Sequence, residues 1–234
     1  MPVVTRALIL VNVVVFFFEL GLSPEYLDQV FYLFGIVPAR FTHPDWAASV
    51  GFPAESYLSL LTHQFLHGGW LHIISNMWTL WIFGDNVEDR MGPVRFGIFY
   101  LACGVVAAVT QVLSSPNSTV PSVGASGAIA GVLGAYFVLF PTARLVVMFP
   151  IFFFPFFFEL PAVFYLGLWF LIQLFSGAFA LAGPEEVGGI AWWAHIGGFM
   201  CGILLCGLFV RRPAERRMQP DEYGMEWAWD PRRR

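Results

Sequence analysis

Residues 123–131 read Val-Gly-Ala-Ser-Gly-Ala-Ile-Ala-Gly, a run of small side chains around a single hydroxyl, that of Ser126. Small and apolar residues continue from there as far as Pro141. Because small residues let membrane helices approach closely, the stretch can be a packing surface and nothing more. The alternative is a serine nucleophile, which needs a general base and donors for an oxyanion at the same depth in the fold. Whether the rest of the chain supplies such a base and such donors decides between these two interpretations.

The composition indicates an integral membrane protein. Of 234 residues, 58% are hydrophobic and 12% are charged, whereas a soluble domain carries about 25% charged residues. The length fits one domain. The formal net charge of -4 gives no reason to expect a nucleic-acid partner. Three cysteines lie in apolar runs and are interpreted as small core residues rather than a disulfide framework: Cys103, Cys201 and Cys206.

Six apolar segments predict an all-α membrane protein, a bundle of six transmembrane helices with a long first outer loop. The segments cover residues 3–20, 69–83, 94–113, 126–140, 161–179 and 193–210. The first has no small-x-small cleavage site after it and is expected to be a retained anchor. Residues 21–60, which are broken by prolines and charges, predict a loop with short helical pieces at the interface. Residues 1–210 then form the membrane domain, and 211–234 a disordered cytoplasmic tail.

Arginine placement predicts the orientation. With six spans, one side of the membrane receives Arg6, Arg90, Arg95, Arg144 and the arginine-rich tail, and the other side receives only Arg40. The positive-inside rule therefore predicts that both termini are cytoplasmic. Trp192 and Trp193 then fall where an outer aromatic belt is expected.

Four polar side chains are predicted to share one depth. Counting back from the inner boundary at 1.5 Å per residue puts Ser126, His195 and His72 roughly 20–24 Å above it, with Asn76 one turn deeper. The spans that carry Ser126 and His195 run in the same direction across the membrane, so these two residues are expected to lie level with each other. Close approach through small-xxx-small faces would let the hydroxyl reach the imidazole. The faces are Gly127 and Gly131 on one span, and Gly198 and Gly202 on the other.

These residues suggest catalytic roles. Ser126 needs a base, and His195 is the candidate, because an unperturbed imidazole titrates near neutrality. No acidic residue lies in this layer, so the pattern predicts a Ser–His dyad. His72 and Asn76, spaced i, i+4, share a helix face and can donate to an oxyanion together with the Ser126 backbone N–H. Gly124 is expected to leave room for a substrate backbone.

A second histidine pair allows a different interpretation. His63 and His67 are also spaced i, i+4, which suits a metal site. However, the sequence has no His-Glu-x-x-His motif and no carboxylate nearby. The preferred interpretation is that both histidines form hydrogen bonds that pin the first loop to the top of the second span. No metal and no cofactor are expected.

Together these motifs resemble the rhomboid intramembrane serine proteases. The matching motifs are Thr-His at 62–63 followed by His67, His72 and Asn76, then Gly-x-Ser-Gly at 124–127 and Ala-His-x-Gly-Gly at 194–198. The resemblance covers nearly all of the chain except the tail, in the six-helix form common in bacteria. It implies a multi-pass protein of a bacterial inner membrane that cleaves single-span membrane proteins in or beside their transmembrane segment.

The resemblance also implies individual roles. Ser126 would be the nucleophile, His195 the base, and His72 and Asn76 oxyanion-side residues. The fifth helix and the outer loop before the sixth would gate substrate entry, and Glu88 would be structural. The chain departs from members that carry an aromatic residue four positions after the nucleophile, since Ala130 stands there. A ring beside the histidine must come from elsewhere, with Phe199 and Tyr136 as candidates.

Two other functions fit the sequence less well. A rhomboid-like protein that binds membrane proteins, or controls their quality, without catalysis would resemble this fold but lack the serine or the histidine, and Ser126 and His195 are both present. A transporter or channel would need features this chain lacks, namely a second short helix in a repeated half and a buried acidic site.

Overall fold

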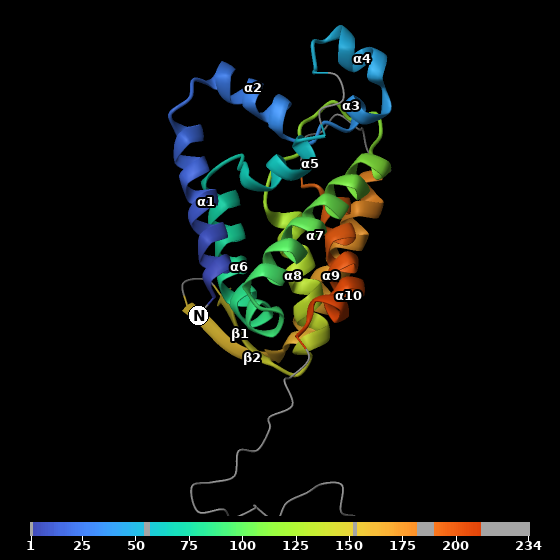
Figure 1. Ribbon diagram of the computed structural model, residues 1–234. Coiled ribbons are helices and arrows are strands. Elements are labelled where there is room, and N and C mark those ends of the chain that lie inside the picture. The colour runs from blue at the N-terminus through green and yellow to red at the C-terminus, as the bar shows by residue number, and fades with distance from the viewer. Residues whose placement is uncertain (1, 54–56, 152–153, 182–189, 212–234) are drawn as a thin grey trace, which may run out of the picture.

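The computed structural model describes residues 2–53, 57–151, 154–181 and 190–211. In this part of the chain, long helices stand side by side in one bundle, with short helices at one end and a β-hairpin at the other (Figure 1). This confirms the expected helical membrane bundle. The long helices are α1 (Val3–Leu20), α6 (Trp70–Met91), α7 (Pro93–Ser114), α8 (Ser126–Leu139), α9 (Ala162–Leu181) and α10 (Trp192–Phe209).

Length and apolarity identify the membrane-crossing helices. By these two measures α1, α7, α9 and α10 are each able to cross a bilayer. Helix α8 is apolar but has only 14 residues. Helix α6 is long enough, but its last two turns are charged. The protein is therefore an integral, multi-pass membrane protein in which α8 is a short element enclosed by the others.

The long first loop contains short helices, as the sequence predicted. They are α2 (Pro24–Phe34), α3 (Pro38–Thr42), α4 (Pro44–Ser49), α5 (Ser59–Thr62) and the 3₁₀ turn η1 (His63–Phe65). The first three each begin with proline, which suits the first position of a helix because its missing N–H has no partner there in any case. Ile36 and Ser122 exchange backbone hydrogen bonds of 2.9 and 2.7 Å, and so join this loop to the linker before α8.

Helix α6 runs farther than predicted. The sequence suggested an end near Gly84, but the helix continues to Met91. The reason is Glu88, which is 2% exposed and accepts hydrogen bonds from the Val4 N–H, the Thr5 N–H and the Thr5 hydroxyl at 2.7–2.9 Å. These donors lie in the first turn of α1, where backbone N–H groups lack intrahelical partners. Glu88 therefore has the structural role expected for it.

A β-hairpin was not predicted. Strands β1 (Arg144–Ile151) and β2 (Phe154–Pro161) pair antiparallel, and an Arg144–Glu159 ion pair of 3.0 Å joins them near the base. The Ala162 N–H donates to the Ala143 carbonyl at 2.8 Å, which connects the hairpin directly to the start of α9. Open sheet edges do not occur in the hydrocarbon region, which agrees with the position of the hairpin at one end of the bundle (Figure 1).

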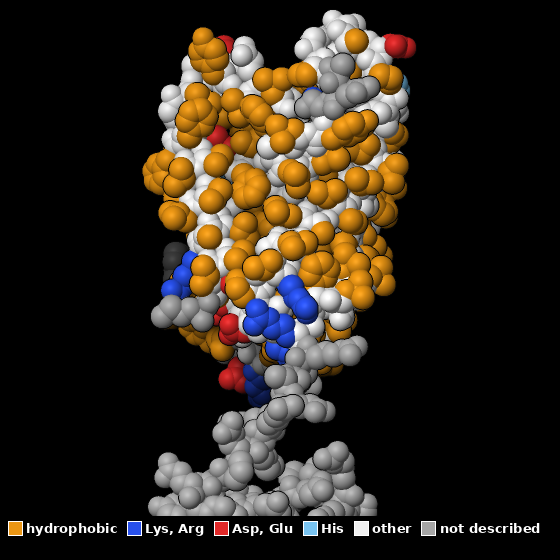
Figure 2. All heavy atoms as spheres, viewed as in Figure 1, with side chains coloured by type: hydrophobic (Ala, Val, Ile, Leu, Met, Phe, Trp, Pro, Cys, Tyr) orange, Lys and Arg blue, Asp and Glu red, His pale blue; other side chains and the backbone are white. Residues whose placement is uncertain are grey.

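Charge is distributed as expected along the bundle axis. Apolar side chains cover the middle of the visible face, and basic side chains gather at the end that carries the hairpin (Figure 2). Among the described arginines, only Arg40 belongs to the outer-loop helices, in α3. Residues 212–234, the rest of the predicted tail, lie outside the described residues.

Glycines bring α8 and α10 together. Every residue from Gly127 to Tyr136 is buried, so α8 is the centre of the core. A side chain at Gly198 would collide with the Gly127 carbonyl, and one at Gly202 with the Gly131 carbonyl. The prediction that small-xxx-small faces bring these two helices together is confirmed, and the resulting backbone approach positions the first turn of α8 beside α10.

Candidate active site

Ser126 is the first residue of α8, and Ala125 is the N-cap. The side chain is half-buried. Just before it, Gly124 has φ +130°, a conformation that side chains rarely allow, and its N–H donates to the His63 carbonyl at 2.9 Å. The backbone N–H groups of the first turn of α8 have no intrahelical acceptors. The serine hydroxyl therefore lies beside a group of backbone donors.

His195 on α10 contacts Ser126 directly. Its Nε2 is 2.8 Å from the serine Oγ, and its Nδ1 is 2.9 Å from Oε1 of Gln173 on α9. The Gln173 amide is oriented by a second bond, in which its Nε2 donates to the Trp169 carbonyl at 3.0 Å. Because Oε1 can only accept, Nδ1 of the imidazole carries the proton. Nε2 then has a free lone pair, which can accept the serine hydroxyl proton.

The role of Gln173 was not predicted from the sequence. Since no acidic residue lies in this layer to orient His195, the sequence predicted an unassisted dyad. Gln173 supplies the orienting acceptor as a neutral amide that is 4% exposed. A signal for it was available, because Gln173 is the only amide or charged residue between Pro161 and Leu181, and strongly polar residues within spans are functional candidates.

Two tryptophans flank the His195 ring. The Trp169 ring lies 5.9 Å from it at an interplanar angle of 33°, and the Trp192 ring lies 6.4 Å away, edge on at 86°. These rings, rather than the suggested Phe199 and Tyr136, surround the imidazole. Phe199 stacks on Phe170 at 4.7 Å, and Tyr136 packs edge on against Phe83 at 4.9 Å. Trp192, which the sequence placed at an aromatic belt, therefore also packs beside the site.

His72 and Asn76 approach the site from α6. A β-carbon at Gly124 would lie 2.6 Å from His72 Nε2 and 3.7 Å from Asn76 Nδ2. The His72 ring thus fills the space beside Gly124 that was predicted to accommodate a substrate backbone. The Asn76 amide donates one N–H to His67 Nε2 at 3.1 Å and keeps a second N–H. The structure therefore brings all five predicted site residues to one end of α8.

His63 and His67 fix the loop above the site. The ring Nδ1 of His63 forms a hydrogen bond of 2.9 Å with the Ser59 carbonyl. The backbone N–H of His67 donates to the Glu19 carboxylate at 3.2–3.3 Å. Burial lowers the pKa of His63 to about 4. Burial, and then the nearby His72, lowers the pKa of His67 to about 4. Both rings are thus neutral near pH 7, which is what His67 needs in order to accept from Asn76.

The arrangement suits activation of a hydroxyl. A serine hydrogen-bonded to a neutral imidazole, whose other nitrogen is held by a third group, is the usual geometry for nucleophilic catalysis. Here the three groups come from three helices: Ser126 from α8, His195 from α10 and Gln173 from α9. The first turn of α8 and the Asn76 amide present donors on the adjoining side.

Comparisons with known proteins agree on one family. A family model described as a Rhomboid domain matches residues 54–212. Rhomboid protein 1, mitochondrial, of Saccharomyces cerevisiae is 30% identical over 169 residues, which cover 70% of this chain and 45% of that protein. RHOMBOID-like protein 4 of Arabidopsis thaliana is 31% identical over 154 residues, or 66% of this chain and 34% of that protein. The Rhomboid protease GluP of Bacillus subtilis is 45% identical over 76 residues, which cover 32% of this chain and 14% of that protein. The matches span less than half the length of these relatives.

Proposed function

The chain belongs to the rhomboid family, and on that premise we propose that it is an intramembrane serine endopeptidase that cleaves the transmembrane segments of other proteins. The observation that carries the proposal is the 2.8 Å contact between Ser126 Oγ and His195 Nε2. The name of one relative, the Rhomboid protease GluP, supports the same activity.

The first chemical step is attack by Ser126 on a peptide carbonyl. As the Oγ–C bond forms, the hydroxyl proton passes to His195 Nε2, which later delivers it to the leaving amine. Gln173 holds the imidazole in the tautomer that can accept this proton. Because an amide carries no charge, Gln173 stabilises the imidazolium less than a carboxylate would, so the base is a dyad with a neutral positioning residue.

The carbonyl oxygen of the tetrahedral intermediate becomes negative and needs donors. The N–H groups that begin α8 point toward this charge, and the positive end of the helix dipole favours it. The free N–H of Asn76 is a further donor, and His72 is positioned beside it by Gly124. Removing one donor of such a site typically slows the reaction by roughly a hundredfold or more.

Water must then enter to hydrolyse the acyl-enzyme. The linker at 114–119 is uncharged and rich in serine, and it lies on the side from which α8 begins. We propose that water enters from this outer end. The loop before α10, proposed to gate the site together with α9, falls mostly at 182–189, outside the described residues.

The orientation follows from charge. Both termini are proposed to lie on the arginine-rich side of the membrane, by the positive-inside rule. The relatives include mitochondrial, plant and bacterial proteins, so they do not support the expected bacterial inner membrane over another membrane. Single-span membrane proteins are the proposed substrates.

The test uses the full chain in liposomes with a panel of single-span proteins, and mass spectrometry identifies the cleavage products. Ser126→Ala is expected to abolish cleavage, whereas the control Ser49→Ala, an exposed serine at the end of α4, should leave it unchanged. A serine-directed fluorophosphonate should label Ser126. Cleavage that survives in Ser126→Ala would exclude the assigned nucleophile. A chain that neither cleaves nor labels would instead be a non-catalytic rhomboid-like binding or quality-control protein.

A further inference from the structure

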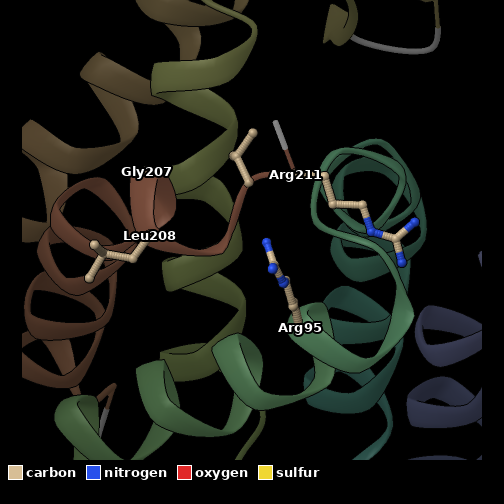
Figure 3. A pocket seen from close by; sticks show the side chains of 5 residues that line it. Arg95, Gly207, Leu208 and Arg211 are labelled. Carbon is tan, nitrogen blue, oxygen red and sulfur yellow. The ribbon is translucent and has the colours of Figure 1, made fainter. Parts of the chain in front are cut away.

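A cavity of about 770 Å³ opens at the hairpin end of the bundle, far from Ser126. It lies between the first turn of α7 and the last turn of α10, and is lined by Arg95, Gly207, Leu208, Val210 and Arg211. Figure 3 shows the Arg95 side chain extending from α7 toward the segment that leaves α10, and the Arg211 side chain extending across the neighbouring turn. Two arginines thus line one cavity together with apolar residues, although the Arg211 guanidinium points away from Arg95 and lies over Gly92.

Helix stability does not account for Arg95. It is the third residue of α7, where the dipole of the helix is positive. A basic side chain there is unfavourable, whereas a bound anion would interact well with both the guanidinium and the helix end. Arg95 is exposed, so the cost of keeping it there without a ligand is small. Its position is suited to an anion that enters the cavity.

The second arginine is held in a defined place. The Arg211 N–H donates to the Arg90 carbonyl at 2.9 Å, which ties the exit of α10 to the end of α6. Its guanidinium lies over Gly92, whose φ is +79°, and any side chain at position 92 would collide with it. The glycine therefore provides the space in which Arg211 rests, and Arg211 forms one wall of the cavity.

Neither arginine is neutralised by a carboxylate in the part of the chain that the structure describes. There the only ion pair joins Arg144 and Glu159. The nearby Glu88 carboxylate is already engaged by the first turn of α1. Two positive charges are thus free to bind an anion from outside the protein.

The apolar wall identifies the kind of anion. Leu208 is 76% exposed and Leu204, one turn above it, is 71% exposed, and Val94 beside Arg95 is 72% exposed. In a membrane helix these side chains face lipid tails. A free phosphate would use only the guanidinium groups, whereas a phospholipid would use both parts of the cavity. Basic pockets between transmembrane helices on the positively charged side of a membrane suit such headgroups.

We propose that this cavity binds the phosphate headgroup of an anionic phospholipid of the adjoining leaflet. The phosphate lies between Arg95 and Arg211, and an acyl chain runs along Leu208 toward Leu204. This site is independent of the proposed peptidase chemistry, because none of its residues belongs to the catalytic layer.

Native mass spectrometry of the full chain, exchanged from nanodiscs that hold equal phosphatidylglycerol and phosphatidylcholine, tests the proposal. The native chain should retain phosphatidylglycerol preferentially. The double variant Arg95→Gln, Arg211→Gln should bind it about 25-fold more weakly, at about fivefold for each arginine near a membrane surface. The matched control Arg6→Gln removes an exposed arginine from α1 at the same end of the bundle and should retain the lipid. Circular dichroism checks that all variants keep their helices.

Two further arms separate the sources of phosphate. Leu208→Asn should weaken retention of phosphatidylglycerol and leave binding of inorganic phosphate unchanged. The lipid assignment is overturned if inorganic phosphate displaces phosphatidylglycerol with the same arginine dependence, since the site would then take free phosphate. It is also overturned if the double variant retains as much lipid as the native chain, or if Arg6→Gln loses as much as the double variant, since bulk charge alone would then explain retention.

Discussion

Nε2 of His195 lies 2.8 Å from Oγ of Ser126, although the two residues are 69 positions apart in the sequence. The contact exists because Gly198 and Gly202 allow α10 to press its backbone against α8. Side chains in place of these glycines would collide with the Gly127 and Gly131 carbonyls and push the two helices apart. The geometry of the proposed active site is therefore a consequence of helix packing.

If Ser126 and His195 act as one unit, the losses of activity caused by replacing each of them should not add in the double variant. We expect Ser126→Ala and His195→Ala each to lower kcat/KM by about a thousandfold or more, and the double variant to be no slower than either single variant. Initial rates on one cleaved single-span substrate in liposomes provide the measurement. Independent, multiplying losses would contradict a shared proton transfer.

Gln173 should act through His195 as a positioning residue. Gln173→Met keeps the volume but removes the acceptor for Nδ1, and we expect kcat to fall about tenfold, the equivalent of one hydrogen bond, with little change in KM. The rate of labelling by a fluorophosphonate should fall in parallel. Gln173→Glu retains an acceptor and should keep more activity than Gln173→Met. A purely structural role would instead lower thermal stability equally in both variants and leave the kcat of the folded fraction unchanged.

Gly124 should tolerate no side chain. In Gly124→Ala the new β-carbon would lie 2.6 Å from His72 Nε2, on a backbone with φ +130°. We expect a loss of about 1–3 kcal/mol in stability from backbone strain, and a fall of about a hundredfold in activity from displacement of the α6 side chains. The control is Gly97→Ala on α7, where the nearest atom would be at an ordinary 3.5 Å. Equal effects at both glycines would argue against this account.

Glu88 should contribute strongly to stability. Glu88→Ala removes the acceptor for three donors at the start of α1 and leaves the two Thr5 donors buried, so we expect a loss of about 2–4 kcal/mol, seen as a lower Tm in detergent. The control Glu159→Ala breaks the exposed pair with Arg144 and should cost less than about 1 kcal/mol. The explanation fails if the two variants melt alike.

Acidification should destabilise the loop above the site. The pKa values of His63 and His67 are lowered by burial to about 4, whereas an unfolded histidine titrates near 6.5. Between these values the unfolded state binds more protons at these two histidines, so their contribution to stability is fully present above about pH 6.5 and is lost as the pH falls toward 4. Tm measured across this window should decline, and His63→Gln should decline less steeply. An equal slope in the variant would show that other groups are responsible.

The sequence alone determined the class of the protein and the identity of its candidate residues. Runs of apolar residues predict which segments enter the membrane, because the side chains of a membrane-spanning helix must either pack in the protein core or face lipid. For this reason α1, α7, α8, α9 and α10 begin and end close to their predicted limits. Glycine spacing indicated which helices approach closely, and depth counting selected Ser126, His195, His72 and Asn76.

Tertiary structure decided what touches what. The amide that orients His195, the tryptophans around it, the His72 ring over Gly124 and the bonds that extend α6 to Met91 all join segments far apart in the chain. Sequence periodicity describes only the side of a helix on which a residue lies. The rotation of each helix about its axis is set by packing against all of its neighbours together. This rotation places Gln173, rather than another residue of α9, beside His195.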